Sequence, residues 1–254
     1  MIKFFRKIRK QLLGEGKTGK YFKYALGEIL LVMIGILLAL QVNNWNEGKN
    51  QQKDEKRTLK ALLSELNDNK SLIKLCLKGI NESKQYGDSL KMYLGPSPTT
   101  LKNEDVNRFI GEVGYVNNCG IRTDILKDLQ GSGKLNLITS DSIRIHISRW
   151  SSSLKLLQDE RDEWAQEYST QFIPFTNKWI QWDDVDYYLY KGEYGSFKSR
   201  FSMDSRLILQ QPEFSNVVYL QTWRMTRGIY FLERMQMHTE DLIKLIELEL
   251  DEYD

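Results

Sequence analysis

The stretch that decides the fold is residues 21–45, YFKYALGEILLVMIGILLALQVNNW. Its centre, residues 29–40, has no charged side chain and none that forms hydrogen bonds, and the flanks out to residues 24 and 42 add only Glu28 and Gln41 as polar side chains. An α-helix rises 1.5 Å per residue, so about 20 residues cross a hydrocarbon core of about 30 Å. The stretch therefore predicts one transmembrane helix over residues 24–45, with the chain before it and the chain after it on opposite sides of a membrane.

The chain before this helix is strongly basic. Residues 1–23 contain eight lysine and arginine residues against a single acidic residue, Glu15. Because positive residues stay on the cytoplasmic side, we expect the amino terminus in the cytoplasm and everything from Trp45 onward outside it. No small-x-small cleavage pattern follows residue 40, which favours an uncleaved anchor over a signal peptide.

Apolar side chains stand between the basic ones in residues 1–23, which predicts a cytoplasmic amphipathic segment. Such a segment lies on a membrane surface and pairs its cations with the anionic lipids of the inner leaflet. The basic residues expected to contact that leaflet are Lys3, Arg6, Lys7, Arg9 and Lys10. The alternative is a plain positive-inside signal that forms no surface helix.

Small residues share one face of the expected membrane helix. Gly27, Gly35 and Ala39 are separated by multiples of four residues, and a small-x-x-x-small pair lets two helix backbones approach closely. This face predicts self-association of the anchor. Glu28 lies near the helix end, where it reaches the headgroups or pairs with Lys23 or Lys20; the alternative is a role in helix pairing or in proton-coupled work.

The remainder of the chain is polar and balanced in charge. The whole chain has 36 basic and 34 acidic side chains and a net charge of +2, which offers no electrostatic case for nucleic-acid binding. Two histidines are too few for most metal or triad chemistry, and neither a phosphate loop, a dinucleotide fingerprint nor paired-cysteine zinc spacing is present. The sequence therefore predicts no catalytic residue, no cofactor and no metal, and an enzyme is the least favoured class.

The two cysteines, Cys76 and Cys119, leave two interpretations open. A secreted disulfide framework usually has more cysteines, which favours two buried free thiols. The alternative is one disulfide between two helices, which requires an oxidising compartment.

Helical periodicity dominates after residue 50. Apolar residues recur at three- and four-residue steps over residues 59–94, 143–168 and 214–246, and only four prolines interrupt the chain. The first of these helices is expected to continue from the membrane helix. We predict an all-α protein in which residues 46–254 form a periplasmic bundle of long antiparallel helices.

An aromatic-rich stretch, residues 172–190, is the strongest candidate for a binding surface. Trp179, Trp182 and Tyr187 either join two helices in a core or face a ligand or partner. Arg161 interrupts the apolar stripe of the preceding helix and is expected to be solvated or locally paired, with presentation to an anionic ligand as the minor alternative. The three acids at 183, 184 and 186 lack the spacing of a calcium loop.

The opening of the chain resembles a bacterial family catalogued as domain of unknown function 6090. The motifs that carry the resemblance are FRKIR at residues 5–9, GKYFKYA at 19–25, GEI at 27–29, IGI at 34–36 and NNWN at 43–46, with GKLNLI at 133–138 and QPEF at 211–214. The resemblance implies a single-pass envelope protein of Gram-negative bacteria, in the inner membrane. The family brings no assigned activity, so it supplies no catalytic residue.

These observations favour a membrane-anchored structural or interaction protein of the bacterial cell envelope, working as a homo-oligomer or with another envelope protein. The alternative is an envelope sensor or binding module whose ligand or partner site lies near residues 172–190.

Overall fold

The computed structural model describes residues 18–114 and 118–253, and every regular element among them is helical. Their contacts divide the chain into two units, Met1–Arg57 and Thr58–Asp254. The elements are α2 (Thr18–Lys91), α3 (Asn103–Val113), α4 (Asp124–Gly131), η1 (Lys134–Leu137), α5 (Asp141–Glu167), the π-helix η2 (Tyr168–Phe172), α6 (Ile173–Thr176), α7 (Trp182–Tyr190), η3 (Glu193–Gly195), η4 (Ser205–Gln210) and α8 (Pro212–Asp251). The expected all-α architecture is confirmed.

The described part of the first unit is the amino-terminal part of α2. Its apolar stretch is long and hydrophobic enough to cross a membrane, and no part of that stretch is buried in the protein. Side chains such as Ile29, Leu38 and Val42 are 61–64% exposed. The expected amphipathic segment falls largely outside the described residues, and only residues 18–23 of it are seen, as the first turns of α2.

In the second unit, the part of α2 after Thr58 pairs with α8. Lys70 forms an ion pair with Glu240 at 3.4 Å, and Gly87 lies against Thr222. Because residue numbers rise along α2 as they fall along α8, the two helices are antiparallel, as expected from their matching apolar stripes.

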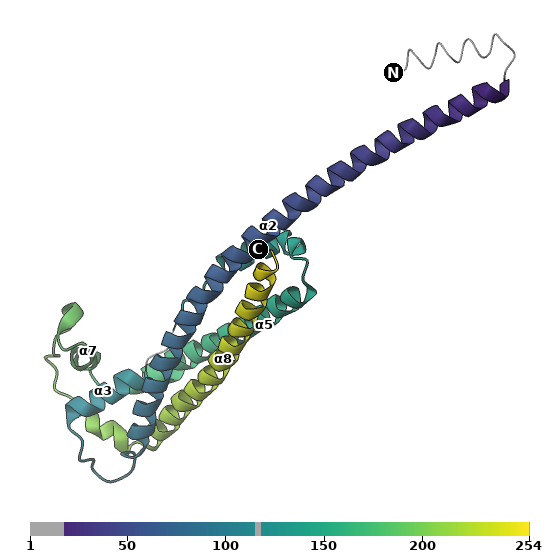
Figure 1. Ribbon diagram of the computed structural model, residues 1–254. Coiled ribbons are helices and arrows are strands. Elements are labelled where there is room, and N and C mark those ends of the chain that lie inside the picture. Colours follow the sequence, from purple (N-terminus) through teal and green to yellow (C-terminus); the bar gives the residue numbers. More distant parts are fainter. Residues whose placement is uncertain (1–17, 115–117, 254) are drawn as a thin grey trace. The chain divides into compact units, whose positions relative to one another are not determined.

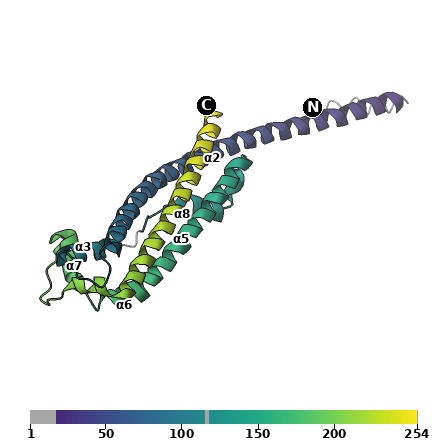
Figure 2. The same ribbon diagram turned by 90° about the horizontal axis from the view of Figure 1, so that it is seen from below.

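α5 packs along the same length of α8 and is the third long helix of the bundle (Figures 1 and 2). The indole Nε1 of Trp150 donates a hydrogen bond to Thr239 Oγ1 at 2.9 Å, and that of Trp164 donates to Gln221 Oε1 at 2.7 Å. α5 is therefore antiparallel to α8 as well. Each tryptophan is 2–3% exposed, and the hydrogen bond satisfies its only polar atom.

The three stripes meet in one long core. Many of its members belong to the stripes expected from periodicity. They include Leu59, Leu62, Leu66, Ile73, Ile80, Ile143, Ile147, Trp150, Leu232, Met235, Leu242 and Ile246. The amphipathic stripes therefore do what their spacing predicts, which is to bury one face of each helix against the other two.

A second core lies at the end of the unit remote from Thr58, where α3, α7, η4 and the start of α8 surround Phe172 and Phe214 (Figure 1). α3 begins at Asn103 with Lys102 as its N-cap residue. The Asn103 side chain is held by segment 203–205, accepting from Ser205 N at 2.6 Å and donating to Met203 O at 3.1 Å.

Pro174 follows a change in the form of the helix that precedes it. α5 ends at Glu167 and continues as the π-helix η2, in which the N–H of Ile173 bonds to the carbonyl of Tyr168. Proline has no N–H to give to the turn before it, and a wider turn accommodates that loss. The widened turn places Phe172, fully buried, in the second core.

Candidate functional site

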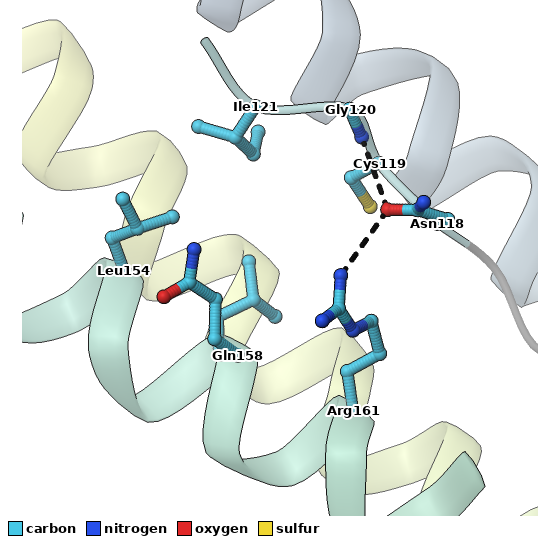
Figure 3. Close-up of a pocket in the computed structure, with 8 residues that line it drawn as sticks. Asn118, Cys119, Gly120, Ile121, Leu154, Gln158 and Arg161 are labelled. Atoms are coloured by element: carbon cyan, nitrogen blue, oxygen red, sulfur yellow. Dashed lines mark hydrogen bonds between the residues drawn. The ribbon is translucent and has the colours of Figure 1, made fainter. Parts of the chain in front are cut away.

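Arg161 lines a small pocket between α5 and the segment that follows α3 (Figure 3). The pocket has a volume of about 120 Å³. Its lining residues are Asn118, Cys119, Gly120, Ile121, Leu154, Leu157, Gln158 and Arg161.

The guanidinium of Arg161 is occupied locally. It donates to Asp162 Oδ1 at 2.7 and 3.1 Å and to Asn118 Oδ1 at 3.4 Å, and its side chain is 42% exposed. This arrangement confirms the expectation of a locally paired arginine. Pockets that hold organic ligands usually measure about 300–1,000 Å³, so this one suits at most a few atoms.

One wall of the pocket is a disulfide between Cys76 of α2 and Cys119, whose Cα atoms lie 5.6 Å apart. The expectation of two buried free thiols is wrong, and the alternative of one disulfide holds. The sequence could not decide between them because the residues are 43 positions apart and only the packing of segment 118–126 on α2 brings them together.

Polar side chains of α2 hold the same segment 118–126. Asn69 donates to the carbonyl of Arg122 and accepts from its N–H, both at 2.8 Å. The carboxylate of Glu65 accepts from the N–H groups of Ile125 and Leu126 at 2.8 and 3.3 Å, which satisfies the first turn of α4. Asn69 interrupts the apolar stripe of α2 with a polar side chain, and that side chain holds the loop around Arg122 in place.

The aromatic residues chosen from the sequence do not form one exposed patch. Trp179 and Trp182 pack against the second core, and Trp182 Nε1 donates to Asn177 Oδ1 at 2.8 Å. Tyr187 packs edge-on against Tyr188, with centroids 5.4 Å apart. None of the three lines the pocket of Arg161. Of the two interpretations left open by the sequence, core packing therefore holds for Trp179 and Trp182.

The residues expected to associate membrane helices all lie on the exposed part of α2. A Cβ added at Gly27 or Gly35 would meet no atom within 4 Å, and Ala39 is exposed. Glu28 is half-buried and interacts with the rest of the chain. The small-residue face is therefore open in the single chain.

A buried ion network between α5 and α8 escaped the sequence analysis. Arg224, whose side chain is 8% exposed, donates to Glu160 at 2.8 Å, to Glu163 at 2.9 Å and to Glu167 at 2.5 and 2.9 Å. Arg227 donates to the other oxygen of Glu160. The available signal was the spacing of three glutamates on one face of α5, but any charged helix face shows similar spacing.

The network shifts the acidity of its carboxylates. Burial alone raises the pKa of Glu160, but the hydrogen bonds from Arg227 and Arg224 outweigh it and hold the pKa below its ordinary value. The hydrogen bond from Arg224 lowers the pKa of Glu167, and the same bond raises the pKa of Arg224. Glu160, Glu167 and Arg224 are therefore charged at neutral pH, and their ion pairs join α5 to α8.

Comparison with protein-family models, curated proteins and solved structures finds no match to this chain. The resemblance of its opening residues to the family of domain of unknown function 6090 stays a prediction.

Metal binding has no geometric support in the described residues. Within 18–114 and 118–253, no three His, Cys, Asp or Glu side chains are arranged to hold a metal ion, and this includes the acids at 183, 184 and 186.

Proposed function

We propose that this protein is a membrane-anchored interaction protein of a bacterial cell envelope, with its amino terminus in the cytoplasm and its helical bundle in the periplasm. The observation that carries the proposal is the apolar stretch of α2, whose side chains no other part of the described chain buries. Burial in a bilayer removes that surface from water, since about 20 apolar helical residues match the hydrocarbon thickness.

The disulfide supports the proposed side of the membrane. Cys76 and Cys119 both belong to the second unit, and disulfides persist in the periplasm but are rare in the cytoplasm. The basic residues before the span favour the same orientation.

The character of the bundle supports an interaction role. Its helices are fastened to one another by buried side chains such as Arg224 and Trp150, and the pocket beside Arg161 is too small for an organic substrate. The anchor adds an open face of small residues that suits helix pairing. The firmly joined bundle and the open face of the anchor both suit assembly with a second copy or with another envelope protein.

Crosslinking in intact membranes tests the proposal. The native chain is expected to give a discrete crosslinked species, and Gly35→Ile is expected to reduce a self-crosslinked product severalfold because a branched side chain blocks close backbone approach. Gly48→Ile is the matched control, since a Cβ added at Gly48 of α2 also meets no atom within 4 Å but Gly48 lies outside the apolar stretch. A protein that stays uncrosslinked at native abundance contradicts the interaction role.

Orientation has its own test. Alkaline phosphatase fused after Asp254 is expected to be active, because the enzyme requires the periplasm, and a reporter that works only in the cytoplasm is expected to be silent. The opposite pair of results would reject the topology without affecting the crosslinking result.

A binding module is the second candidate function. The observation that favours it is a run of exposed aromatic side chains after α7, in which Tyr194, Phe197 and Phe201 are 64–89% exposed. Exposed aromatic surface of this density marks interaction sites in soluble domains.

A further inference from the structure

A pocket of about 220 Å³ lies where α7 meets the turn that follows it. Asp183, Asp186 and Tyr190 are three and four residues apart, so they share one face of α7. Tyr194 and Phe197 come from the turn and line the same pocket. The pocket thus combines three aromatic rings with two carboxylates.

The backbone of the turn is folded back to build this pocket. Lys191, Gly192, Tyr194 and Gly195 all have positive φ angles, between 50° and 82°. Left-handed conformations at a lysine and a tyrosine cost free energy and occur where the fold requires them. These backbone conformations place the ring of Tyr194 against that of Tyr190, with centroids 5.6 Å apart and planes at 85°.

Some rings of the protein lie beside its own cations. Lys49 lies 4.0 Å from the centroid of the Trp45 ring, and Arg227 lies 5.0 Å from that of Trp223. Tyr187 and Tyr188 of α7 are a further case, because Lys198 lies 5.1–5.4 Å from the centroids of their rings.

The rings of the pocket have no such cation beside them. In the part of the chain that the structure describes, no basic side chain lies over the rings of Tyr190, Tyr194 or Phe197, and these rings are 44%, 89% and 64% exposed. The charged groups beside them are the carboxylates of Asp183 and Asp186. Negative ring faces and carboxylates both attract positive charge, so the chemistry of this pocket suits a cation.

We propose that this pocket binds an organic ammonium ion, with Tyr190, Tyr194 and Phe197 surrounding the cation and Asp183 and Asp186 balancing its charge. Aromatic cages are the usual way in which proteins recognise such groups. A volume of about 220 Å³ is too small for a large ligand and suits one ammonium group. The ammonium belongs either to a free amine or to a lipid headgroup. This inference rests on the second candidate function and does not depend on oligomer formation.

Calorimetric titration of the full chain with choline chloride tests the proposal. The chain is placed in nanodiscs of phosphatidylglycerol alone, which contribute no ammonium group, and the ionic strength is held constant with sodium chloride. We expect saturable binding with a Kd on the order of 1 mM, because exposed cation–π contacts are individually weak. The probe 3,3-dimethylbutan-1-ol, a neutral analogue of choline, is expected not to bind because it lacks the charge.

Two variants locate the binding. Tyr194→Ala and Asp186→Asn are each expected to weaken choline binding about fivefold, by removing one ring face or one charge. Both side chains are exposed, so both variants are expected to fold, and circular dichroism checks this. Tyr230→Ala is the matched control, since Tyr230 is an exposed tyrosine on α8, outside the pocket, and its removal should leave the Kd unchanged.

Nanodiscs that also contain phosphatidylethanolamine distinguish the two sources. A weaker apparent affinity for choline in these nanodiscs indicates that the lipid headgroup occupies the pocket, and an unchanged affinity indicates a free amine. The proposal is overturned by absence of saturable binding at tens of millimolar, by equal binding of the neutral analogue, or by wild-type affinity in both variants. Such a failure, with crosslinking retained, removes the ammonium site and leaves the proposed interaction role intact.

Discussion

At the scale of single residues, Arg224 has the largest set of strong contacts among the features described. Its guanidinium reaches three glutamates of α5, while its own side chain and that of Glu160 are only 8% and 4% exposed. Taking charges out of water is costly, so such a group stabilises the fold only while all of its partners are present. Loss of Arg224 therefore destabilises the fold mainly because it leaves buried carboxylates without their partner, and less because the attraction itself is lost.

Arg224→Met is expected to lower the free energy of unfolding by about 3 kcal/mol, because Glu160 then stays buried with Arg227 alone. Adding Glu160→Met should recover most of the loss. The matched control is Lys155→Met, which breaks an exposed pair with Asp159 and should cost less than about 1 kcal/mol. Urea unfolding of the full chain in detergent, followed by circular dichroism, measures all three. Equal losses for Arg224→Met and Lys155→Met would show that the network is no stronger than a surface pair.

The same carboxylates predict the response to acid. Glu160 and Glu167 have folded-state pKa values below their ordinary value of 4.5, so the unfolded chain binds protons more readily. Their contribution is complete well above pH 4.5 and is lost as the pH falls from there through the folded-state values. Arg224→Gln should flatten this acid dependence, since its hydrogen bonds lower both pKa values. Melting temperatures of the native chain and of Arg224→Gln, measured from pH 7 downward, report this dependence. If both fall in parallel with pH, Glu160 and Glu167 are not the source of the acid dependence.

At the scale of elements, the packing of α2 on α8 depends on close approach at a glycine. A Cβ at Gly87 would lie 2.4 Å from Cγ2 of Thr222, whose hydroxyl is held by the carbonyls of Val218 and Tyr219. Thr222 cannot rotate away without giving up these bonds. Glycine is unfavourable inside a helix, so its presence here is explained by the neighbouring helix and not by α2 itself.

Gly87→Ala is expected to destabilise the second unit by about 1–2 kcal/mol, because the overlap with Thr222 exceeds the gain in helix propensity. Gly131→Ala is the control, since Gly131 is also helical and an added Cβ there meets no atom within 4 Å. That change should be neutral or stabilising by up to about 1 kcal/mol. Chemical unfolding of the two variants compares them, and stabilisation by Gly87→Ala would show that α2 and α8 are farther apart than described.

At the scale of the whole molecule, the chain consists of an exposed apolar helix segment and a bundle closed by one covalent bond. Cys76 and Cys119 close a loop of about 43 residues that runs through α3 and the second core. A cross-link of this length restricts the unfolded chain and so favours the folded one. It also ties the bundle's stability to the redox state of its compartment.

Reduction of this disulfide, or the double change Cys76→Ser and Cys119→Ser, is expected to lower the free energy of unfolding by about 2–4 kcal/mol. Thermal unfolding with and without dithiothreitol measures the effect. The double variant is its own control, because dithiothreitol should not change its melting temperature. A native chain that melts at the same temperature under both conditions would show that the bond contributes nothing.

The sequence alone determined the helices and the surface each one buries. Apolar side chains at helical spacing specify a face wherever the helix lies, so the stripes of α2, α5 and α8 and the exposed span around Gly35 followed from local pattern. The start of α3, in contrast, is held by a side-chain contact of Asn103 with residues 203–205, which are remote in sequence.

Only the tertiary structure decided which residues meet. The disulfide, the network around Arg224 and the pocket at Tyr194 join side chains from different elements, and charged or aromatic residues occur on many helix faces that never acquire such partners. Trp182 shows the same limit, since the sequence left a core position and an exposed surface both open and packing places it against the second core. Helical periodicity is a property of neighbours along the chain, whereas a site depends on distances that the fold alone sets.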